Sequence, residues 1–245
     1  MSSASLQVPK SLEEIAGPDR CALVVYDMQA GILAQLPHGP QILGKVLEVL
    51  EVARGHDFRI VFLRHMSLPT KLAGVFQLRQ AMAWQRVDGP EAVKPWFLRG
   101  SAGFELAPEL GVRADEAIFD KISMSAFEGT PLSMALRDCG MISFMICGIA
   151  TEIGIDPTVR HGADLGFIPI VIADACGHMR YMGDAIAQVC NSVSSPPCFY
   201  TVQAILRCRL SSRSVRMASA SRRTEGLLFI GNVRFAPESG HVQCN

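Results

Sequence analysis

The sequence has no excess charge of either sign, because 23 Lys and Arg balance 23 Asp and Glu over 245 residues. No overall field would therefore draw the protein to nucleic acid or to an anionic membrane. Its eight cysteines include no C-x-x-C pair, and several lie inside apolar runs, which disfavours a disulfide framework or a zinc site. The most apolar run, MISFMICGIA, is far shorter than the roughly 20 residues of a membrane span. We expect a cytoplasmic protein with reduced thiols and with neither membrane nor nucleic acid as partner.

What the sequence does contain is a regular alternation of apolar runs and amphipathic stretches up to about residue 183. Five runs are almost continuously apolar, as strands buried on both faces of a parallel sheet are: 21–27, 58–65, 116–121, 142–149 and 167–174. In 40–55 and 130–140 the apolar residues share one helical face. This order predicts an α/β fold, a doubly wound three-layer α/β/α sandwich with a mostly parallel sheet.

Composition divides the chain into three predicted parts: an N-terminal arm (1–17), the α/β domain (18–184) and an atypical C-terminal segment (185–245). The last part has seven Arg, no Lys and many Ser, and its Arg-rich stretch has no clear period, so we interpret it as a solvated tail. Only LLFIGNVRF, near the end, has the pattern of a strand. The stretch 66–104 breaks the alternation; it is either an excursion over the sheet edge or a loop that covers substrate or contacts another subunit.

Polar residues that end predicted strands are the first candidates for a site, because doubly wound sheets bind ligands at the carboxyl ends of their strands. Asp27 ends the first run, Lys121 the third and Asp174 the fifth, and the turn 150–154 follows the fourth. An Asp and a Lys in one desolvated cleft stabilise each other's charges and provide a base and a cation. Taken singly, Asp27 is more typical of a turn or cap residue and Lys121 of a surface residue.

Pro157 limits where the helix after the fourth strand begins, because proline is tolerated only in the first helical turn. A start between residues 152 and 156 places Gly154 at the positive end of that helix, where free N–H groups can bind an anion. The alternative is that Gly154 serves only the tight turn.

Three stretches, in order, resemble the motifs of one family: ALVVYDMQAGIL, DKISMSAFEGTPLSMALRDCG and GIATEIGIDPTVRHGADLGFIPIVIADAC. They are similar to the Asp-x-Gln strand, the Lys segment with Ser-Ala-Phe-x-Gly-Thr, and the nucleophile turn of the isochorismatase-like cysteine hydrolases. The resemblance covers about 18–184 and implies a homo-dimer or tetramer that acts on a small molecule without a cofactor. The helix and short strand that complete the sheet in this family are not recognisable after residue 188.

By this resemblance Asp27 is the catalytic acid–base, Lys121 is the second member of the triad, and Gly154 stands where the family has its cysteine. The family also implies a cis peptide at Ile149–Ala150, with the Ala150 and Gly154 N–H groups forming an oxyanion hole. Gln29 and Phe127, from the same motifs, are added as substrate-binding candidates.

A glycine in place of the cysteine divides the family's chemistry. Members similar to nicotinamidases, carbamoylsarcosine amidases and ureidoacrylate hydrolases attack an amide through a thiolate. Isochorismatases carry glycine there and hydrolyse a vinyl ether without a covalent intermediate, yet the preceding Ala150, Thr151 and Glu152 resemble the amidase branch. We expect a hydrolase of a vinyl ether or an amide or ureido bond that works without a cysteine nucleophile. The alternative is a catalytically retired member that binds a ligand or serves assembly.

Other side chains offer little to replace the thiol. Cys147 is predicted to pack in the core, and Cys176 lies nearer the expected pocket. Ser125 has no evident histidine partner, and His161 is predicted to be an exposed helix residue. His65 stands alone in the region where metal-binding members have paired histidines, so we predict no metal.

Overall fold

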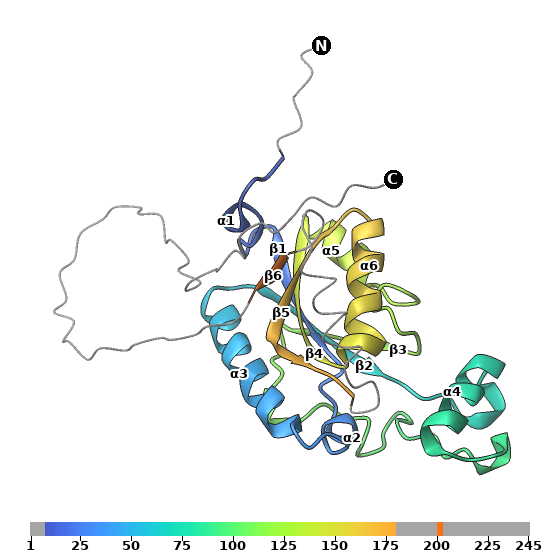
Figure 1. The fold of residues 1–245 in the computed structure, drawn as a ribbon. Coiled ribbons are helices and arrows are strands. Elements are labelled where there is room, and N and C mark those ends of the chain that lie inside the picture. Colours follow the sequence, from blue (N-terminus) through green and yellow to red (C-terminus); the bar gives the residue numbers. More distant parts are fainter. Residues whose placement is uncertain (1–7, 180–199, 203–245) are drawn as a thin grey trace, which may run out of the picture.

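The computed structural model describes residues 8–179 and 200–202, and they form a parallel six-stranded sheet between layers of helices (Figure 1). The strand order is β3-β2-β1-β4-β5-β6. The strands are β1 (Cys21–Tyr26), β2 (Arg59–His65), β3 (Ala117–Lys121), β4 (Ser143–Ile149), β5 (Ile168–Gly177) and β6 (Tyr200–Val202). The predicted doubly wound α/β fold is confirmed, and the strand order reverses between β1 and β4, where such sheets bind ligands.

Helices cover both faces of the sheet, as the amphipathic stretches predicted. The α-helices are α1 (Leu12–Ile15), α2 (Ala30–Leu33), α3 (Gly39–Gly55), α4 (Val75–Gln85), α5 (Leu132–Asp138) and α6 (Asp156–Asp164). The shorter helical turns are η1 (Thr70–Leu72), η2 (Pro90–Ala92), η3 (Pro108–Leu110) and the π-helical turn η4 (Thr151–Ile155). The apolar face of α3 packs on β4 and β5, and α5 and α6 cover the opposite face.

Strand β1 is buried along its whole length and divides its side chains between the two cores. Leu23 and Val25 belong to the core beneath α3, whereas Ala22, Val24 and Tyr26 belong to the core beneath α5 and α6. This alternation follows from the two-residue period of a strand. It directs Tyr26, the last residue of β1, toward the side of the sheet on which α6 begins.

One prediction about the later strands is wrong, and one strand was not recognised in the sequence. Strand β5 does not end at Asp174 but continues to Gly177, because a register irregularity between Ile146 and Gly148 of β4 lets the extra residues pair. A further parallel strand does exist, since Tyr200–Val202 pairs with β5. Three residues carry too little pattern to reveal a strand in the sequence. LLFIGNVRF and most of the predicted C-terminal segment, including its boundary at 184, lie outside the described residues.

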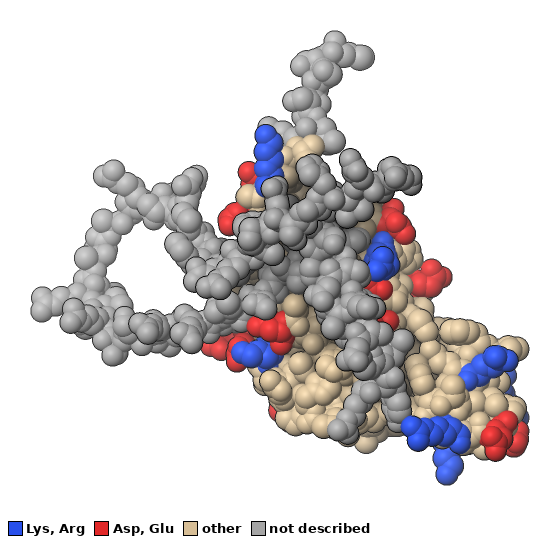
Figure 2. Space-filling model, viewed as in Figure 1, with Lys and Arg blue, Asp and Glu red and all other residues tan. Residues whose placement is uncertain are grey.

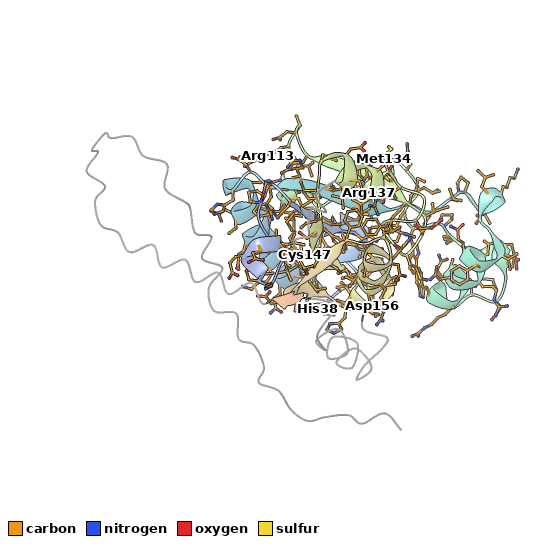
Figure 3. All side chains as sticks on the ribbon, turned by 90° about the horizontal axis from the view of Figure 1, so that it is seen from above. His38, Arg113, Met134, Arg137, Cys147 and Asp156 are labelled. Carbon is orange, nitrogen blue, oxygen red and sulfur yellow. The ribbon has the colours of Figure 1, made fainter. Side chains whose placement is uncertain are left out.

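Most of the stretch 66–104 forms a lobe around α4 that stands away from the body of the domain (Figures 1 and 3), whereas Phe97 and Phe104 pack in the core beneath α3. None of the α4 residues is buried, and large apolar side chains are exposed at Leu72, Val75 and Phe76. Figure 2 shows basic and acidic side chains interspersed over the face in view, without a broad patch of one sign on the described residues there. Among the residues described, no helix combines the length and apolar character that a bilayer crossing requires.

Candidate active site

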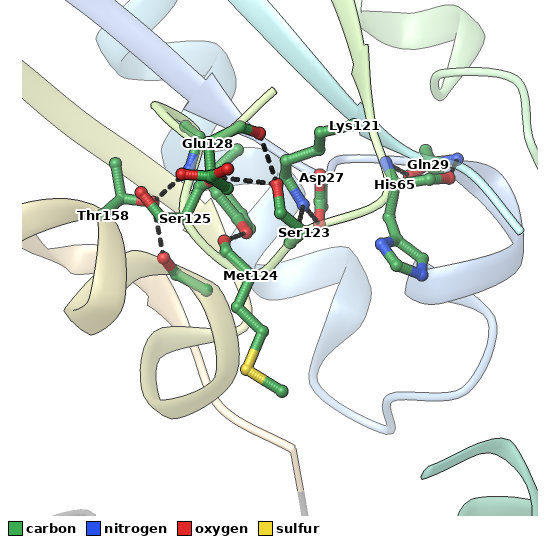
Figure 4. A network of polar contacts seen from close by, with 12 residues as sticks. Asp27, Gln29, His65, Lys121, Ser123, Met124, Ser125, Glu128 and Thr158 are labelled. Atoms are coloured by element: carbon green, nitrogen blue, oxygen red, sulfur yellow. Dashed lines mark hydrogen bonds and ion pairs between the residues drawn. The ribbon is translucent and has the colours of Figure 1, made fainter. Parts of the chain in front are cut away.

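Asp27 and Lys121 meet at the carboxyl end of the sheet, as their positions at strand ends predicted (Figure 4). Asp27 follows β1 in a left-handed conformation (φ 48°), which Asp tolerates better than most side chains, and its N–H donates to Leu63 O at 3.1 Å. Lys121 ends β3 and reaches across the end of β2. Lys121 Nζ lies 2.8 Å from Asp27 Oδ2, and the side chains are 1% and 8% exposed. They form a buried ion pair at the topological switch.

The surroundings of the pair favour neutral forms. Burial raises the pKa of Asp27 to about 6, although the Lys121 charge opposes the shift, and burial lowers the pKa of Lys121. Burial and the Lys121 charge together lower the pKa of the neighbouring His65 to about 3, so its ring is neutral at neutral pH. Asp27 Oδ1 is buried and has no hydrogen-bond partner among the described residues. The carboxyl therefore keeps one oxygen unoccupied and exchanges its proton near neutral pH.

The turn after β4 carries the predicted cis peptide, Ile149–Ala150. It leads into η4 and then α6, which has Pro157 in its first turn. The Gly154 N–H donates to Ala150 O at 3.0 Å, so an oxyanion bound at this turn would have to share that donor. The oxyanion hole of Ala150 and Gly154 stays a prediction.

Tyr26 fills the space beside Gly154. A Cβ built at Gly154 would lie less than 3.0 Å from Oη, Cε1 and Cζ of Tyr26, which is closer than real Cβ atoms approach other atoms. The Tyr26 hydroxyl donates to Met124 O, and Lys121 Nζ lies 4.2 Å from the centre of the Tyr26 ring. Burial and the nearby Asp27 charge raise the pKa of Tyr26 well above its usual value, so the phenol stays protonated.

A family model, the isochorismatase domain, matches residues 21–186. The chain belongs to the isochorismatase family. It is 30% identical over 165 residues to an uncharacterised isochorismatase family protein, YwoC of Bacillus subtilis, covering 64% of this chain and 77% of the relative. It is 25% identical over 188 residues to the ureidoacrylate amidohydrolase RutB of Serratia proteamaculans, covering 70% of this chain and 75% of the relative. The crystal structure of a cysteine hydrolase from Pseudomonas syringae shares the fold with a TM-score of 0.62 at 21% identity, covering 83% and 94% of the two chains.

In this member of the isochorismatase family, Gln29 is committed to the protein's own backbone. It is completely buried, and its amide donates to His65 O at 3.0 Å and to Phe104 O at 2.7 Å. Its carbonyl accepts the His65 N–H at 2.7 Å. Gln29 thus links the end of β2 to the loop 103–107 through hydrogen bonds. It lies beside the site, but its polar atoms bond backbone groups instead of facing the site.

Phe127 likewise lies in the core beneath α5 and α6. Its ring stacks on Phe167 with centroids 5.6 Å apart and contacts Phe144 edge-on at 5.4 Å. Only 6% of the residue is exposed. Its role as a substrate-binding residue therefore stays a prediction that depends on the small exposed part of the side chain.

The prediction that Ser125 has no histidine partner is wrong, as is the prediction that His161 is exposed. Ser125 Oγ lies 2.9 Å from His161 Nδ1, and both residues are partly buried. The loop after β3 folds back against α6, which brings together residues that are 36 positions apart in the chain. No local pattern in the sequence signals this pairing. Tyr26 was missed for the same reason, although a bulky aromatic directly before Asp27 was a visible signal.

Cys147 lies in β4 and Cys176 in β5, the two strands next to the turn that carries Gly154. Cys147 is fully buried, inside the layers in Figure 3, and burial raises its thiol pKa to about 12, so its predicted place in the core is confirmed. Cys176 is partly buried beside Ile146 O. Within the described part of the chain, no three His, Cys, Asp or Glu side chains are arranged to hold a metal ion.

A cavity of about 70 Å³ lies between the lobe and the ends of β2 and β3. Its walls are mostly apolar and include Trp84, Trp96 and Phe97 from the stretch 66–104. His65 and Ile122 close it on the side of the sheet. His65 therefore lies between this cavity and the Asp27–Lys121 pair, since Figure 4 shows it beside the pair and the Lys121 charge acts on its ring.

Proposed function

We propose that this member of the isochorismatase family hydrolyses a small metabolite by acid–base catalysis, without a covalent intermediate. The observation that carries the proposal is the buried Asp27–Lys121 pair, in which Asp27 has a pKa of about 6 and an unpartnered Oδ1. A carboxyl with a pKa near the working pH transfers protons most effectively in both directions. Gly154, in the position that the family resemblance gives to the nucleophile, has no side chain to attack with.

Each residue has a defined part in the proposed reaction. Asp27 Oδ1 exchanges a proton with water or substrate, while Oδ2 stays bound to Lys121. The Lys121 ammonium holds the carboxyl in place and stabilises negative charge that develops beside it. The Ala150 and Gly154 N–H groups bind the substrate oxygen at the turn after β4.

The two candidate reactions use opposite starting forms of Asp27. For an amide or ureido bond, the carboxylate takes a proton from the attacking water and returns it to the leaving nitrogen as the C–N bond breaks. For a vinyl ether, the protonated carboxyl gives its proton to the vinyl carbon. Water then adds to the resulting oxocarbenium ion and returns a proton to Asp27, and the hemiketal so formed breaks its ether C–O bond to release a ketone and an alcohol. The curated relatives named ureidoacrylate amidohydrolase support the first reaction, and a glycine at position 154 supports the second.

The direct test is product release by purified wild-type protein, with Asp27→Asn as control. Pyruvate from isochorismate would identify vinyl-ether hydrolysis, and ammonia or carbamate from ureidoacrylate would identify C–N hydrolysis. We expect the wild type to release one of these products. Asp27→Asn should release none of them while its circular dichroism spectrum stays that of the folded wild type. Equal turnover by both proteins would contradict the role of Asp27.

A second function, ligand binding by a catalytically retired site, is favoured by two observations. Tyr26 occupies the space beside Gly154, and the polar groups of Gln29 and Gly154 are bonded within the protein. On this alternative, small acids or amides raise the melting temperature of the wild type and are recovered unchanged. Turnover that Asp27→Asn abolishes would exclude it.

We further propose that the protein is a cytoplasmic homo-dimer or tetramer whose copies meet through the α4 lobe. The thiols of Cys21, Cys139 and Cys147 suit a reducing compartment. Leu72, Val75 and Phe76 expose apolar surface on the lobe. Sedimentation velocity of the wild type and of Phe76→Ser tests this. A wild-type monomer, or an oligomer that Phe76→Ser leaves intact, would contradict the contact.

A further inference from the structure

Gly154 is not required by the local backbone. Its φ lies outside the left-handed region, and it sits in the turn η4 just before α6, where other side chains are tolerated. What excludes a side chain is the Tyr26 ring, whose Oη, Cε1 and Cζ would all lie less than 3.0 Å from a Cβ. The ring is 1% exposed and cannot simply swing into solvent.

Two contacts hold the Tyr26 ring in place, one through its hydroxyl group and one through the face of the ring. Its hydroxyl donates to Met124 O in the loop after β3. Its face receives the Lys121 ammonium, with Nζ 4.2 Å from the ring centre, a distance at which a cation and an aromatic ring attract. The same ammonium bonds Asp27, so the ring is part of the charged pair's immediate environment.

We propose that Tyr26 takes the place of a nucleophile in this site, filling the space beside Gly154 and offering its negative face to Lys121. Residues 26 and 154 then determine the reaction type together. A large side chain at position 26 leaves room only for glycine at position 154 and so excludes a cysteine thiol there. This inference rests on the proposed function only in assigning Gly154 to the nucleophile position. It also implies that Gly154→Cys alone does not produce a working amidase.

The first test is a double-mutant cycle on thermal stability. In the otherwise wild-type protein, Gly154→Ala should lower the melting temperature by about 5–10 °C, because the added methyl group overpacks a buried site. Gly44→Ala is the matched control, since Gly44 lies in α3 with an ordinary backbone and nothing within 4 Å of the added Cβ, and it should not lower the melting temperature. In a Tyr26→Val background, the loss caused by Gly154→Ala should disappear.

Two further variants at position 26 test whether the ring itself excludes the side chain at position 154. Tyr26→Phe keeps the ring and should leave Gly154→Ala as damaging as before, whereas Tyr26→Leu should relieve it if Tyr26→Val does not fold. A Gly154→Ala protein as stable as the wild type would overturn the proposal. Equal losses in the wild-type and Tyr26→Val backgrounds would overturn it too, because another contact would then exclude the side chain.

The second test reads the chemistry of a thiol at position 154 by alkylation with iodoacetamide. The sulfur forms a bond to the CH₂ carbon, iodide leaves, and the thiol proton passes to solvent; peptide mass spectrometry separates this site from the native cysteines. Residue 154 should react at least tenfold faster in Tyr26→Val/Gly154→Cys than in Gly154→Cys, because removing the ring exposes the thiol to Lys121, which lowers a thiol pKa. Equal rates would overturn the proposal. Neither test measures turnover, so this inference and the proposed function can fail separately.

Discussion

Lys121 Nζ lies 2.8 Å from Asp27 Oδ2, and Asp27 Oδ1, on the same carboxyl, has no hydrogen-bond partner among the described residues. One oxygen is thus fixed and the other is left to meet water or substrate. Buried polar atoms without partners are rare, and they mark places where a ligand or water completes the structure. Because its two oxygens differ in this way, the Asp27 carboxyl is held by Lys121 and can still exchange a proton with water or substrate.

The pH dependence of kcat/KM should show an inflection near pH 6 that belongs to Asp27. If the carboxylate is the base, activity rises as the pH rises through 6; if the protonated acid is needed, activity falls over the same range. In either case Asp27→Asn should lose at least 100-fold in kcat/KM and show no inflection in what remains.

His65→Gln is the control for that profile. His65 contacts the same charged pair, but with a pKa of about 3 its ring does not titrate between pH 5 and 8. The inflection near pH 6 should therefore survive in His65→Gln. Its disappearance there, or its persistence in Asp27→Asn, would assign the titration to a group other than Asp27.

Removing the Lys121 charge should both weaken the fold and move the inflection. Lys121→Met leaves Asp27 buried without its cation, so the pKa of Asp27 rises further and the inflection moves above pH 6. Breaking a buried pair costs about 3–5 kcal/mol of unfolding free energy, which urea denaturation measures. The double variant Asp27→Asn/Lys121→Met should be more stable than Lys121→Met alone. Strictly additive losses would show that the pair is not coupled.

The sequence was sufficient to place the parts of the site that depend on single strands. Asp27 and Lys121 could be found because each ends an apolar run, and parallel strands bring their carboxyl ends to one edge. The contacts that join distant segments could not be found in this way. Tyr26 covers Gly154, and Ser125 meets His161, only after α6 has packed against the sheet, and no local pattern encodes that packing.

Gln29 shows the limit of arguing from a motif. The Asp-x-Gln pattern identifies the residue but not its direction, and the structure turns its amide toward backbone atoms of His65 and Phe104. A polar motif residue near a site can therefore serve the scaffold. Experiment can separate the two roles, because loss of a scaffold contact lowers the stability of the protein, whereas loss of a substrate contact raises KM.

Gln29→Glu should destabilise the protein by about 2–4 kcal/mol, because a buried carboxylate would then face the carbonyls of His65 and Phe104 with no donor between them. Burial raises the folded-state pKa of the new carboxyl, so the variant is closest to the wild type in stability below the unfolded pKa of about 4 and loses stability as the pH rises. Urea denaturation at pH 4 and pH 8 measures this. A rise in KM with unchanged stability would instead make Gln29 a substrate ligand.

The Ser125–His161 pair tests whether a second nucleophile has been overlooked. A serine hydrolase needs a free Ser Oγ, an oriented histidine and unoccupied N–H donors for the oxyanion. Here Ser125 Oγ already accepts the Phe127 N–H at 3.2 Å, and the Ala126 N–H donates to Thr158 Oγ1 at 2.9 Å. In the described residues, no carboxylate bonds the second ring nitrogen of His161. The geometry is that of a structural link between the loop after β3 and α6.

Ser125→Ala should accordingly keep kcat/KM within about twofold of the wild type while lowering the unfolding free energy by about 1 kcal/mol, the usual worth of one hydrogen bond. A fluorophosphonate probe, which phosphonylates an activated serine with loss of fluoride, should leave residue 125 unmodified in the wild type. Loss of turnover in Ser125→Ala together with a phosphonylated Ser125 would overturn the non-covalent mechanism and make this pair the catalytic one. Loss of stability alone, with turnover intact, is the result that the packing of the loop against α6 predicts.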